Sequence, residues 1–197
     1  LVRSRVGLVF QYPEYQLFEE TVYKDIAFGP RNQGLSEEEI DRRVREAAGF
    51  VSIDESLFDS SPFELSGGQK RRIAIAGVIA MRPEVLILDE PMAGLDPEGR
   101  EGIMKNLTAY HNETGAALVI VTHSMEDAAR YAERMIVLAG GEIRMDGAPE
   151  EVFAHAERLQ TLGLDLPEAA HIALLLRRKG LPLSEAIYSP DRLRDEL

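Results

Sequence analysis

Hydrophobic and polar positions along the chain follow two periods, one typical of buried strands and the other of helices. Three short runs rich in β-branched residues, at 6–10, 85–88 and 117–122, are apolar on both faces. Strands that helices cover on both sides of a sheet have this pattern. The sequence therefore predicts an α/β core whose sheet contains these three strands.

The segment between the first two predicted strands is largely helical. Ser36 and the three glutamates after it have the form of a capping box, and Ile40 and Val44 begin a series of apolar residues at helical spacing. A second helix is expected from Ser66 to the residue before Pro83, because proline cannot continue it. We therefore expect a helical subdomain inserted into the core.

The part of the chain after the third strand is predicted to hold a helix and then a hairpin. Ser124 is in position to cap a helix over residues 125–132. Apolar residues at 135–138 and 142–145 flank the Gly-Gly pair at 140–141, which favours a two-residue hairpin turn. This hairpin is the last strand signal in the sequence.

From residue 148 onward the pattern is helical. Three helices are expected to open at Pro149, Pro167 and Ser189-Pro190, because proline suits the first turn of a helix and serine suits its cap. We predict that residues 148–197 form a helical extension separate from the core.

Composition narrows the classes of function. The chain of 197 residues has a formal net charge of -12, which argues against a nucleic-acid backbone as the main partner. It has no cysteine, so disulfides, thiol catalysis and thiolate metal sites are excluded. The longest apolar run, residues 73–81, is far shorter than the roughly 20 residues that span a bilayer, so a membrane role is expected to be peripheral.

Two acidic residues end the second predicted strand. Asp89 and Glu90 follow four apolar residues, and parallel sheets place their ligands at the C-terminal ends of strands. Mg²⁺ takes few protein oxygens and keeps several waters, so one carboxylate can serve the ion while the other activates a water. A solvated acidic turn is the alternative interpretation.

The motif Ser66-Gly67-Gly68-Gln69 stands at the start of a predicted helix. Unpaired backbone N–H groups and the positive end of the helix dipole favour an anion at such a position. The two glycines would let the backbone approach a phosphate closely. The alternative is a simple N-cap with a flexible lead.

Together these motifs resemble the ATP-binding-cassette (ABC) ATPases. Leu65-Ser66-Gly67-Gly68-Gln69 is similar to the signature motif of that family, and residues 85–91 are similar to its Walker B strand, at the spacing that the family uses. The resemblance implies an ABC ATPase core of the P-loop NTPase kind, with a helical subdomain insert and a C-terminal helical extension. It also implies ATP and Mg²⁺ as ligands.

The resemblance assigns the catalytic roles to Glu90, His123 and Gln11. Glu90 would orient or deprotonate the water that attacks the γ-phosphate, and His123 resembles the switch histidine that contacts that phosphate. Asp89 and Gln11 would serve the metal ion. A structural histidine and a polar strand end are the alternatives for His123 and Gln11.

The nucleotide-binding roles are assigned to Ser66, Gly67, Gly68, Gln69 and Asp96. In ABC ATPases the signature motif reaches across a dimer to the γ-phosphate held by the other subunit. Asp96 resembles a residue in the loop that passes between the subunits. Its alternative is an ordinary helix cap before Pro97, and both interpretations can hold at once.

A closer resemblance is to the energy-coupling-factor (ECF) ATPases, which drive vitamin, cobalt and nickel uptake. It rests on residues 11–30, which begin Gln-Tyr-Pro-Glu, and on residues 147–153 and 162–167. It implies an ATP-hydrolysing subunit of an importer that powers uptake of a vitamin or a transition-metal ion through a membrane partner.

The resemblance also divides the chain. Residues 1–147 would form the ABC ATPase domain, with the glutamine loop and helical subdomain at about 12–65, and residues 148–197 would be a helical extension that helps dimerisation. The phosphate loop of the family, Gly-x-x-x-x-Gly-Lys-Ser/Thr, is not present, because the dipeptide Gly-Lys occurs nowhere in the chain. We expect a chain that lacks its N-terminal segment, with the loop encoded upstream, and that is inactive alone.

The expected partners are a second ABC ATPase subunit, identical or paralogous, a transmembrane coupling protein and a substrate-binding membrane component, but no nucleic acid. The expected location is peripheral, on the cytoplasmic face of a prokaryotic cell membrane. One alternative is a soluble ABC ATPase of the DNA-repair or chromosome-maintenance kind, although the insert is short and without heptads. Another is a non-catalytic ABC half that only completes a partner's site.

Overall fold

The computed structural model of the chain describes residues 5–197. Residues 1–4, with which the predicted ATPase domain begins, lie outside the described residues. The chain divides into two compact units, of which the first ends at Val121 and the second begins at Thr122. Each unit is described by itself.

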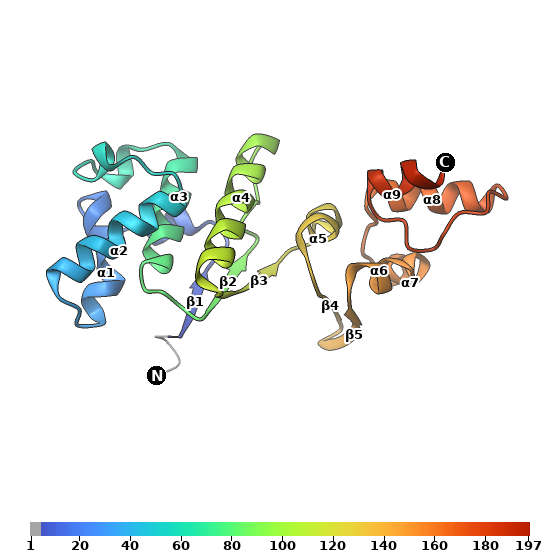
Figure 1. Cartoon of the computed structure of the whole chain (residues 1–197), viewed down its shortest axis with the longest axis horizontal. Helices are drawn as coiled ribbons and strands as arrows, with labels where there is room; N and C mark the ends of the chain where they lie inside the picture. Colours follow the sequence, from blue (N-terminus) through green and yellow to red (C-terminus); the bar gives the residue numbers. More distant parts are fainter. Residues whose placement is uncertain (1–4) are drawn as a thin grey trace. The chain divides into compact units, whose positions relative to one another are not determined.

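The first unit is built on a parallel sheet of three strands. The strands are β1 (Val6–Val9), β2 (Val85–Asp89) and β3 (Ala117–Val121), in the order β1-β2-β3 (Figure 1). Val9 pairs with Leu88, and Asp89 pairs with Val121. The three predicted strands are therefore confirmed, each to within one residue at its end.

Only one face of this sheet is deeply buried. Leu86 and Leu88 are fully buried, whereas Leu8 and Val119, which lie on the other face, are 41% and 45% exposed. The described helices of the first unit therefore do not cover the second face of the sheet. An apolar run shows that both faces can be covered, but the packing of other elements decides whether they are.

Most helices of the first unit lie between β1 and β2. In chain order these are η2 (Pro13–Gln16), α1 (Val22–Asn32), α2 (Glu37–Phe50), η3 (Glu55–Leu57), η4 (Pro62–Glu64) and α3 (Gly67–Ile79). Figure 1 shows α1, α2 and α3 side by side, in agreement with their many mutual contacts. Their shared core includes the fully buried Ile26, Ile40 and Ile73. The predicted helical insert is present.

The start of α2 differs in part from its prediction. Ser36 Oγ accepts a hydrogen bond from the backbone N–H of Glu39 at 3.3 Å, as an N-cap should. The Glu39 carboxylate, however, bonds Arg42 and Arg43 instead of returning to the Ser36 backbone. The predicted capping box is therefore half formed, because two arginines one turn later offer the carboxylate charged donors.

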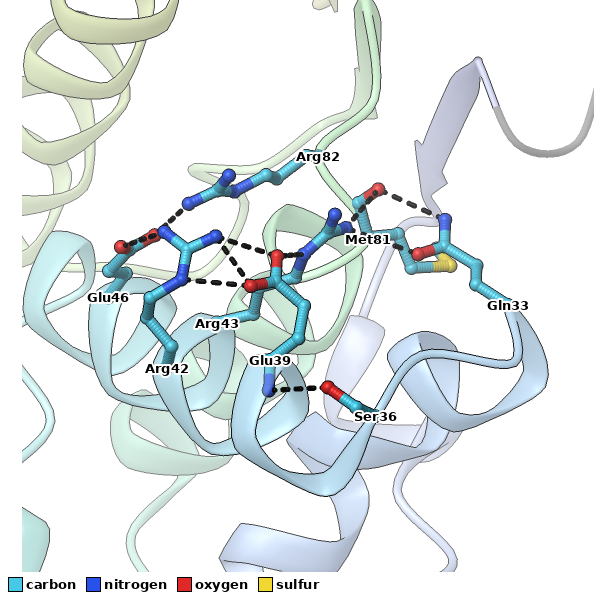
Figure 2. A network of polar contacts seen from close by, with 8 residues as sticks. All are labelled: Gln33, Ser36, Glu39, Arg42, Arg43, Glu46, Met81 and Arg82. Carbon is cyan, nitrogen blue, oxygen red and sulfur yellow. Dashed lines mark hydrogen bonds and ion pairs between the residues drawn. The ribbon is translucent and has the colours of Figure 1, made fainter.

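The end of α3 also differs from its prediction, because the helix ends at Ile79 rather than beside Pro83. Arg82 has a left-handed backbone with φ 53. The Met81 carbonyl accepts 3.0 Å and 3.5 Å hydrogen bonds from the side chains of Gln33 and Arg43 (Figure 2). Side chains from α2 and from the end of α1 thus satisfy one backbone oxygen just beyond this helix end, where carbonyl groups lack partners within the helix.

Helix α4 (Pro97–Thr114) connects β2 to β3. Asp96 caps its start, with Pro97 at the first helical position, and Gly115 ends it with a left-handed φ of 70. The sequence motifs predicted the start of this helix as a cap before proline but gave no length for it.

The second unit begins with α5 (Met125–Tyr131), capped by Ser124, and continues into the hairpin of β4 (Met135–Ala139) and β5 (Glu142–Gly147). At the turn Gly140 and Gly141 have φ of 62 and 78. A type I′ turn requires positive φ at both central residues, so the Gly-Gly pair explains the hairpin. The predicted helix and hairpin are both confirmed.

Four helices follow the hairpin: α6 (Pro149–Phe153), α7 (Ala156–Thr161), α8 (Glu168–Arg178) and α9 (Pro190–Glu196). The three predicted openings are confirmed, but α7 was missed. Its N-cap is His155, whose side chain makes no capping hydrogen bond, so the sequence carries no start signal there.

The hairpin and the C-terminal helices share one core. It includes Met135 and Val137 of β4 together with Phe153, Leu159 and Leu174 of the helices. The predicted domain boundary at 147/148 falls inside this core and stays a prediction. Within residues 5–197, no helix is long and apolar enough to cross a membrane.

Candidate functional site

The predicted metal residue Asp89 and the predicted catalytic residue Glu90 stand at the C-terminal end of β2. Asp89 is the last residue of the strand, and the backbone N–H of Glu90 donates a 2.9 Å hydrogen bond to the Val121 carbonyl. Glu90 has φ 47, in the left-handed region that non-glycine residues rarely adopt. Strained backbone of this kind clusters at functional sites, which supports a special role for Glu90.

Gln11 lies at the same edge of the sheet as these carboxylates. Val9 of β1 pairs with Leu88, so the residues just after the two strands emerge at one level of the parallel sheet. Gln11 is exposed, and the next residue, Tyr12, has a left-handed backbone with φ 56. The structure thus brings Gln11, Asp89 and Glu90 to one edge, as expected.

The predicted signature residues form the first turn of α3. Ser66 Oγ accepts from the Gln69 N–H at 3.3 Å, and the Gln69 side-chain oxygen accepts from the Ser66 N–H at 3.0 Å, which completes a capping box. A side chain added at Gly67 or Gly68 would meet no atom within 4 Å. The backbone of this turn is therefore open to approach.

Asp96 caps α4. Its Oδ1 accepts a 2.9 Å hydrogen bond from the Gly99 N–H, and the loop before it turns at Gly94 with φ 72. The cap interpretation is thus confirmed, and contact with a second subunit stays a prediction. His123 belongs to the second compact unit, directly before the N-cap Ser124, and its role also stays a prediction.

The sequence analysis missed one buried residue of this region, Arg71. Its guanidinium contacts the Glu14 carboxylate and the carbonyl oxygens of Pro91 and Ala93. It is one of two charged residues among the buried positions described. A signal existed in the sequence, since Arg71 lies two residues before Ile73, where the apolar part of α3 begins.

The residues present suit a nucleotide phosphate and its magnesium ion. The open Gly-Gly backbone at the start of α3 would admit a phosphate oxygen near unpaired N–H groups. In the described part of the chain, no group of three or more His, Asp or Glu side chains could hold a metal by itself. Mg²⁺ binds through one or two carboxylates together with substrate phosphates.

A groove of about 950 Å³ lies in the helical subdomain. Phe18 and Phe28, both exposed, form an edge-to-face pair with ring centroids 4.7 Å apart in its lining. Asp25, also in the lining, accepts hydrogen bonds from the Phe18 and Glu19 N–H groups at 3.2 Å and 3.0 Å. Burial raises the pKa of Asp25, and these two bonds oppose the rise.

The chain is similar to known proteins over its whole length. A family model described as ABC transporter matches residues 1–93. The energy-coupling factor transporter ATP-binding protein EcfA2 of Caldanaerobacter subterraneus subsp. tengcongensis is 53% identical over 196 residues, which are 100% of this chain and 68% of the relative. EcfA2 of Clostridium perfringens is 54% identical over 197 residues, again 100% of this chain and 69% of the relative.

This chain belongs to the ABC transporter ATP-binding proteins of the energy-coupling factor type. Solved members of the wider family have the same fold. The structure of cbiO1 from Clostridium perfringens, part of the ABC transporter complex cbiONQ, matches with a TM-score of 0.72 and 42% identity over 89% of this chain and 68% of that chain. The ATP-binding cassette MJ0796, solved as a dimer in a post-hydrolysis state bound to ADP and Pi, matches with a TM-score of 0.63 and 32% identity over 74% of this chain and 63% of that chain.

These similarities confirm the predicted family and fold class. They favour a transporter ATPase over the DNA-repair or chromosome-maintenance alternative, since the relatives are transporter subunits. Membership of the ABC family carries ATP binding with it, and Mg²⁺ is the usual companion ion.

Proposed function

We propose that this chain is the ATP-hydrolysing subunit of an ECF-type importer and powers uptake of a vitamin or a transition-metal ion. The observation that carries the proposal is the pairing of two motifs in one fold. An open, capped helix start at Ser66 suits a phosphate, and a strained Glu90 after a buried strand suits a water-activating base. The similarity to EcfA2 proteins supports the transport role.

The nucleotide and its ion would supply the phosphoryl group and neutralise its developing charge. Asp89 and Gln11 would hold the ion, because Asp89 ends β2 and Gln11 lies two residues after β1, at the same edge of the sheet. Glu90 would accept a proton from the attacking water or hold that water in line. His123 would donate a hydrogen bond toward the γ-phosphate and so help to position the reacting groups.

The signature turn would act on a second subunit rather than on this one. Ser66, Gly67, Gly68 and Gln69 would bind the γ-phosphate that the partner's phosphate loop holds, and Asp96 would contact the partner's site. The dimeric state of the similar cassette MJ0796 supports such an arrangement. Each nucleotide would then bridge two subunits, so hydrolysis would remove the contact that holds them closed.

The helical subdomain would carry this motion to the membrane component. Tyr12, Tyr15 and Phe18 are exposed and are candidates for this contact, whereas Leu17 is 7% exposed and belongs to the subdomain core. The groove lined by Phe18 and Phe28 gives a membrane partner an apolar surface to bind. The chain would thus work as a peripheral subunit on the cytoplasmic face of the membrane, with a substrate-binding membrane component selecting the cargo.

The test is Glu90→Gln in the full-length protein assembled with its partners. We expect ATP binding to be retained and steady-state hydrolysis to fall by about 100-fold or more, because the amide has the same shape but cannot accept the proton. ATP binding is measured by calorimetry and hydrolysis by phosphate release.

Glu84→Gln is the control, since Glu84 forms an exposed ion pair with Arg5 on the same unit. Its hydrolysis should match that of the wild type. Unchanged hydrolysis in Glu90→Gln would remove Glu90 from its role. Absence of hydrolysis in the assembled wild type would instead favour a non-catalytic half that only completes a partner's site.

A further inference from the structure

A buried guanidinium joins three segments that are far apart in the sequence. Arg71, on the second turn of α3, has a side chain only 5% exposed. It donates hydrogen bonds of 2.6 Å to the Ala93 carbonyl and 3.4 Å to the Pro91 carbonyl. Its Nε and Nη2 each lie 3.4 Å from one carboxylate oxygen of Glu14, in η2.

Each of these three segments carries a residue of the proposed site. Pro91 directly follows Glu90, and Ala93 lies in the loop that leads to Asp96. Glu14 is three positions after Gln11. Arg71 itself lies in the same helix as the signature turn.

The chemistry of these contacts calls for arginine. A guanidinium presents five N–H donors in a flat fork, so two can face a carboxylate while a third bonds carbonyl oxygens. A lysine ammonium is a compact point charge on a flexible stem and cannot keep this geometry. Each of the three guanidinium nitrogens of Arg71 donates at least one hydrogen bond.

We propose that Arg71, held by Glu14, is a positioning residue that fixes the loop after Glu90 relative to the signature turn. The proposal rests on the function proposed above. Arg71 does not touch the reacting atoms, and it acts through the placement of Glu90. In the dimer, the signature turn would face the partner's nucleotide while Glu90 faces the nucleotide of its own subunit. Arg71 would therefore couple the two nucleotide sites.

The test uses Arg71→Lys, Glu14→Gln and the double variant in the full-length protein assembled with its partner ATPase and membrane components. We expect kcat for ATP hydrolysis to fall about tenfold in Arg71→Lys with KM within about twofold, because placement of Glu90 matters in the transition state more than in binding. The Hill coefficient for ATP should fall toward about 1. In the double variant, kcat should be only slightly lower than in Arg71→Lys, since the two residues act as one unit.

Matched controls come from an exposed pair of the same kind in the same unit. Arg45 and Asp41 of α2 form an ion pair at 2.8 Å with side chains 46% and 43% exposed. Arg45→Lys and Asp41→Asn should leave kcat and the Hill coefficient at wild-type values. Hydrogen exchange should become faster at residues 91–96 in Arg71→Lys but not in Arg45→Lys. This measurement reports how firmly the loop is held and does not depend on ATP hydrolysis.

Three results would overturn the proposal. The first is wild-type kcat and cooperativity in Arg71→Lys. The second is a loss of kcat that merely follows a lower melting temperature and leaves exchange at residues 91–96 unchanged, which would make Arg71 a purely structural residue. The third is absence of ATP hydrolysis by the assembled wild-type protein. This result would overturn the proposed function itself, and it would be seen in the wild type before any variant is measured.

Discussion

At the scale of single residues, a few non-glycine residues have a strained, left-handed backbone. Among residues 5–197, the non-glycine residues with positive φ are Tyr12, Ser52, Arg82 and Glu90. Each such residue costs of order 1 kcal/mol, so the surrounding structure must hold it in place. Tyr12 follows Gln11 and Glu90 follows Asp89, so two of the four lie beside residues of the proposed site.

The carboxyl of Glu39 has a pKa well below its ordinary value. Hydrogen bonds from Arg42 and then Arg43 lower the pKa of its carboxyl from 4.5 to about 2 (Figure 2). A lowered pKa in the folded state favours folding above pH 4.5, and this contribution is lost as the pH falls through about 2.

We predict that Glu39→Gln makes the stability of the protein less sensitive to acid between pH 4.5 and about 2. The measurement is the urea midpoint of unfolding at a series of pH values across this window. Glu38→Gln, an exposed neighbour in the same helical turn, controls for the loss of one charge and should keep the wild-type slope. Equal slopes in Glu39→Gln and the wild type would contradict the prediction.

At the scale of elements, helices α2 and α3 both begin with a serine N-cap, but their first turns carry different residues. Ser66 caps α3 and Ser36 caps α2, and in each case the hydroxyl accepts a 3.3 Å hydrogen bond from a backbone N–H three residues later. The start of α3 carries the signature glycines, whereas the start of α2 carries glutamates that pair with arginines. The cap gives stability to both helices, and the glycines give α3 its open backbone.

Substitution of the two capping serines can distinguish an effect on stability from an effect on function. We predict that Ser66→Ala and Ser36→Ala each lower the free energy of unfolding by about 1 kcal/mol, because each removes one N-cap. Only Ser66→Ala should also lower ATP hydrolysis by the assembled transporter. The measurements are urea unfolding and phosphate release. Equal hydrolysis in the two variants would contradict a role for Ser66 beyond capping.

At the scale of the whole molecule, we propose that the chain contributes one part of a nucleotide site that two subunits share. Within its 197 residues no Gly-Lys pair is available to bind the β- and γ-phosphates. The residues that it does contribute are those proposed to activate water and to complete a partner's site. In a phosphate loop, the lysine of the Gly-Lys pair supplies positive charge to the β- and γ-phosphates.

We therefore predict that the 197-residue polypeptide by itself binds no ATP at up to about millimolar concentration and does not hydrolyse it, since no phosphate loop neutralises the nucleotide. Isothermal calorimetry with Mg-ATP is the measurement. Circular dichroism on the same sample shows whether the polypeptide is folded. Millimolar or tighter affinity in a folded sample would contradict the prediction.

The sequence by itself determined the features that depend on local chemistry. Buried strand runs, serine caps, the Gly-Gly turn and proline helix starts each have a preferred backbone conformation, so they could be predicted without knowledge of distant contacts. The signature and acidic motifs could be found in the same way, because their spacing is fixed along the chain. Helix α7 was missed because its start carries no local signal of this kind.

Only the tertiary structure decided what depends on residues distant in sequence. Arg71 meets Glu14 and the Pro91 and Ala93 carbonyls across 57, 20 and 22 positions, and no local pattern encodes such a meeting. The early end of α3 likewise depends on side chains from α2 and the end of α1 that bind the Met81 carbonyl. A sequence pattern states which groups must be buried or satisfied, and packing selects the partners that satisfy them.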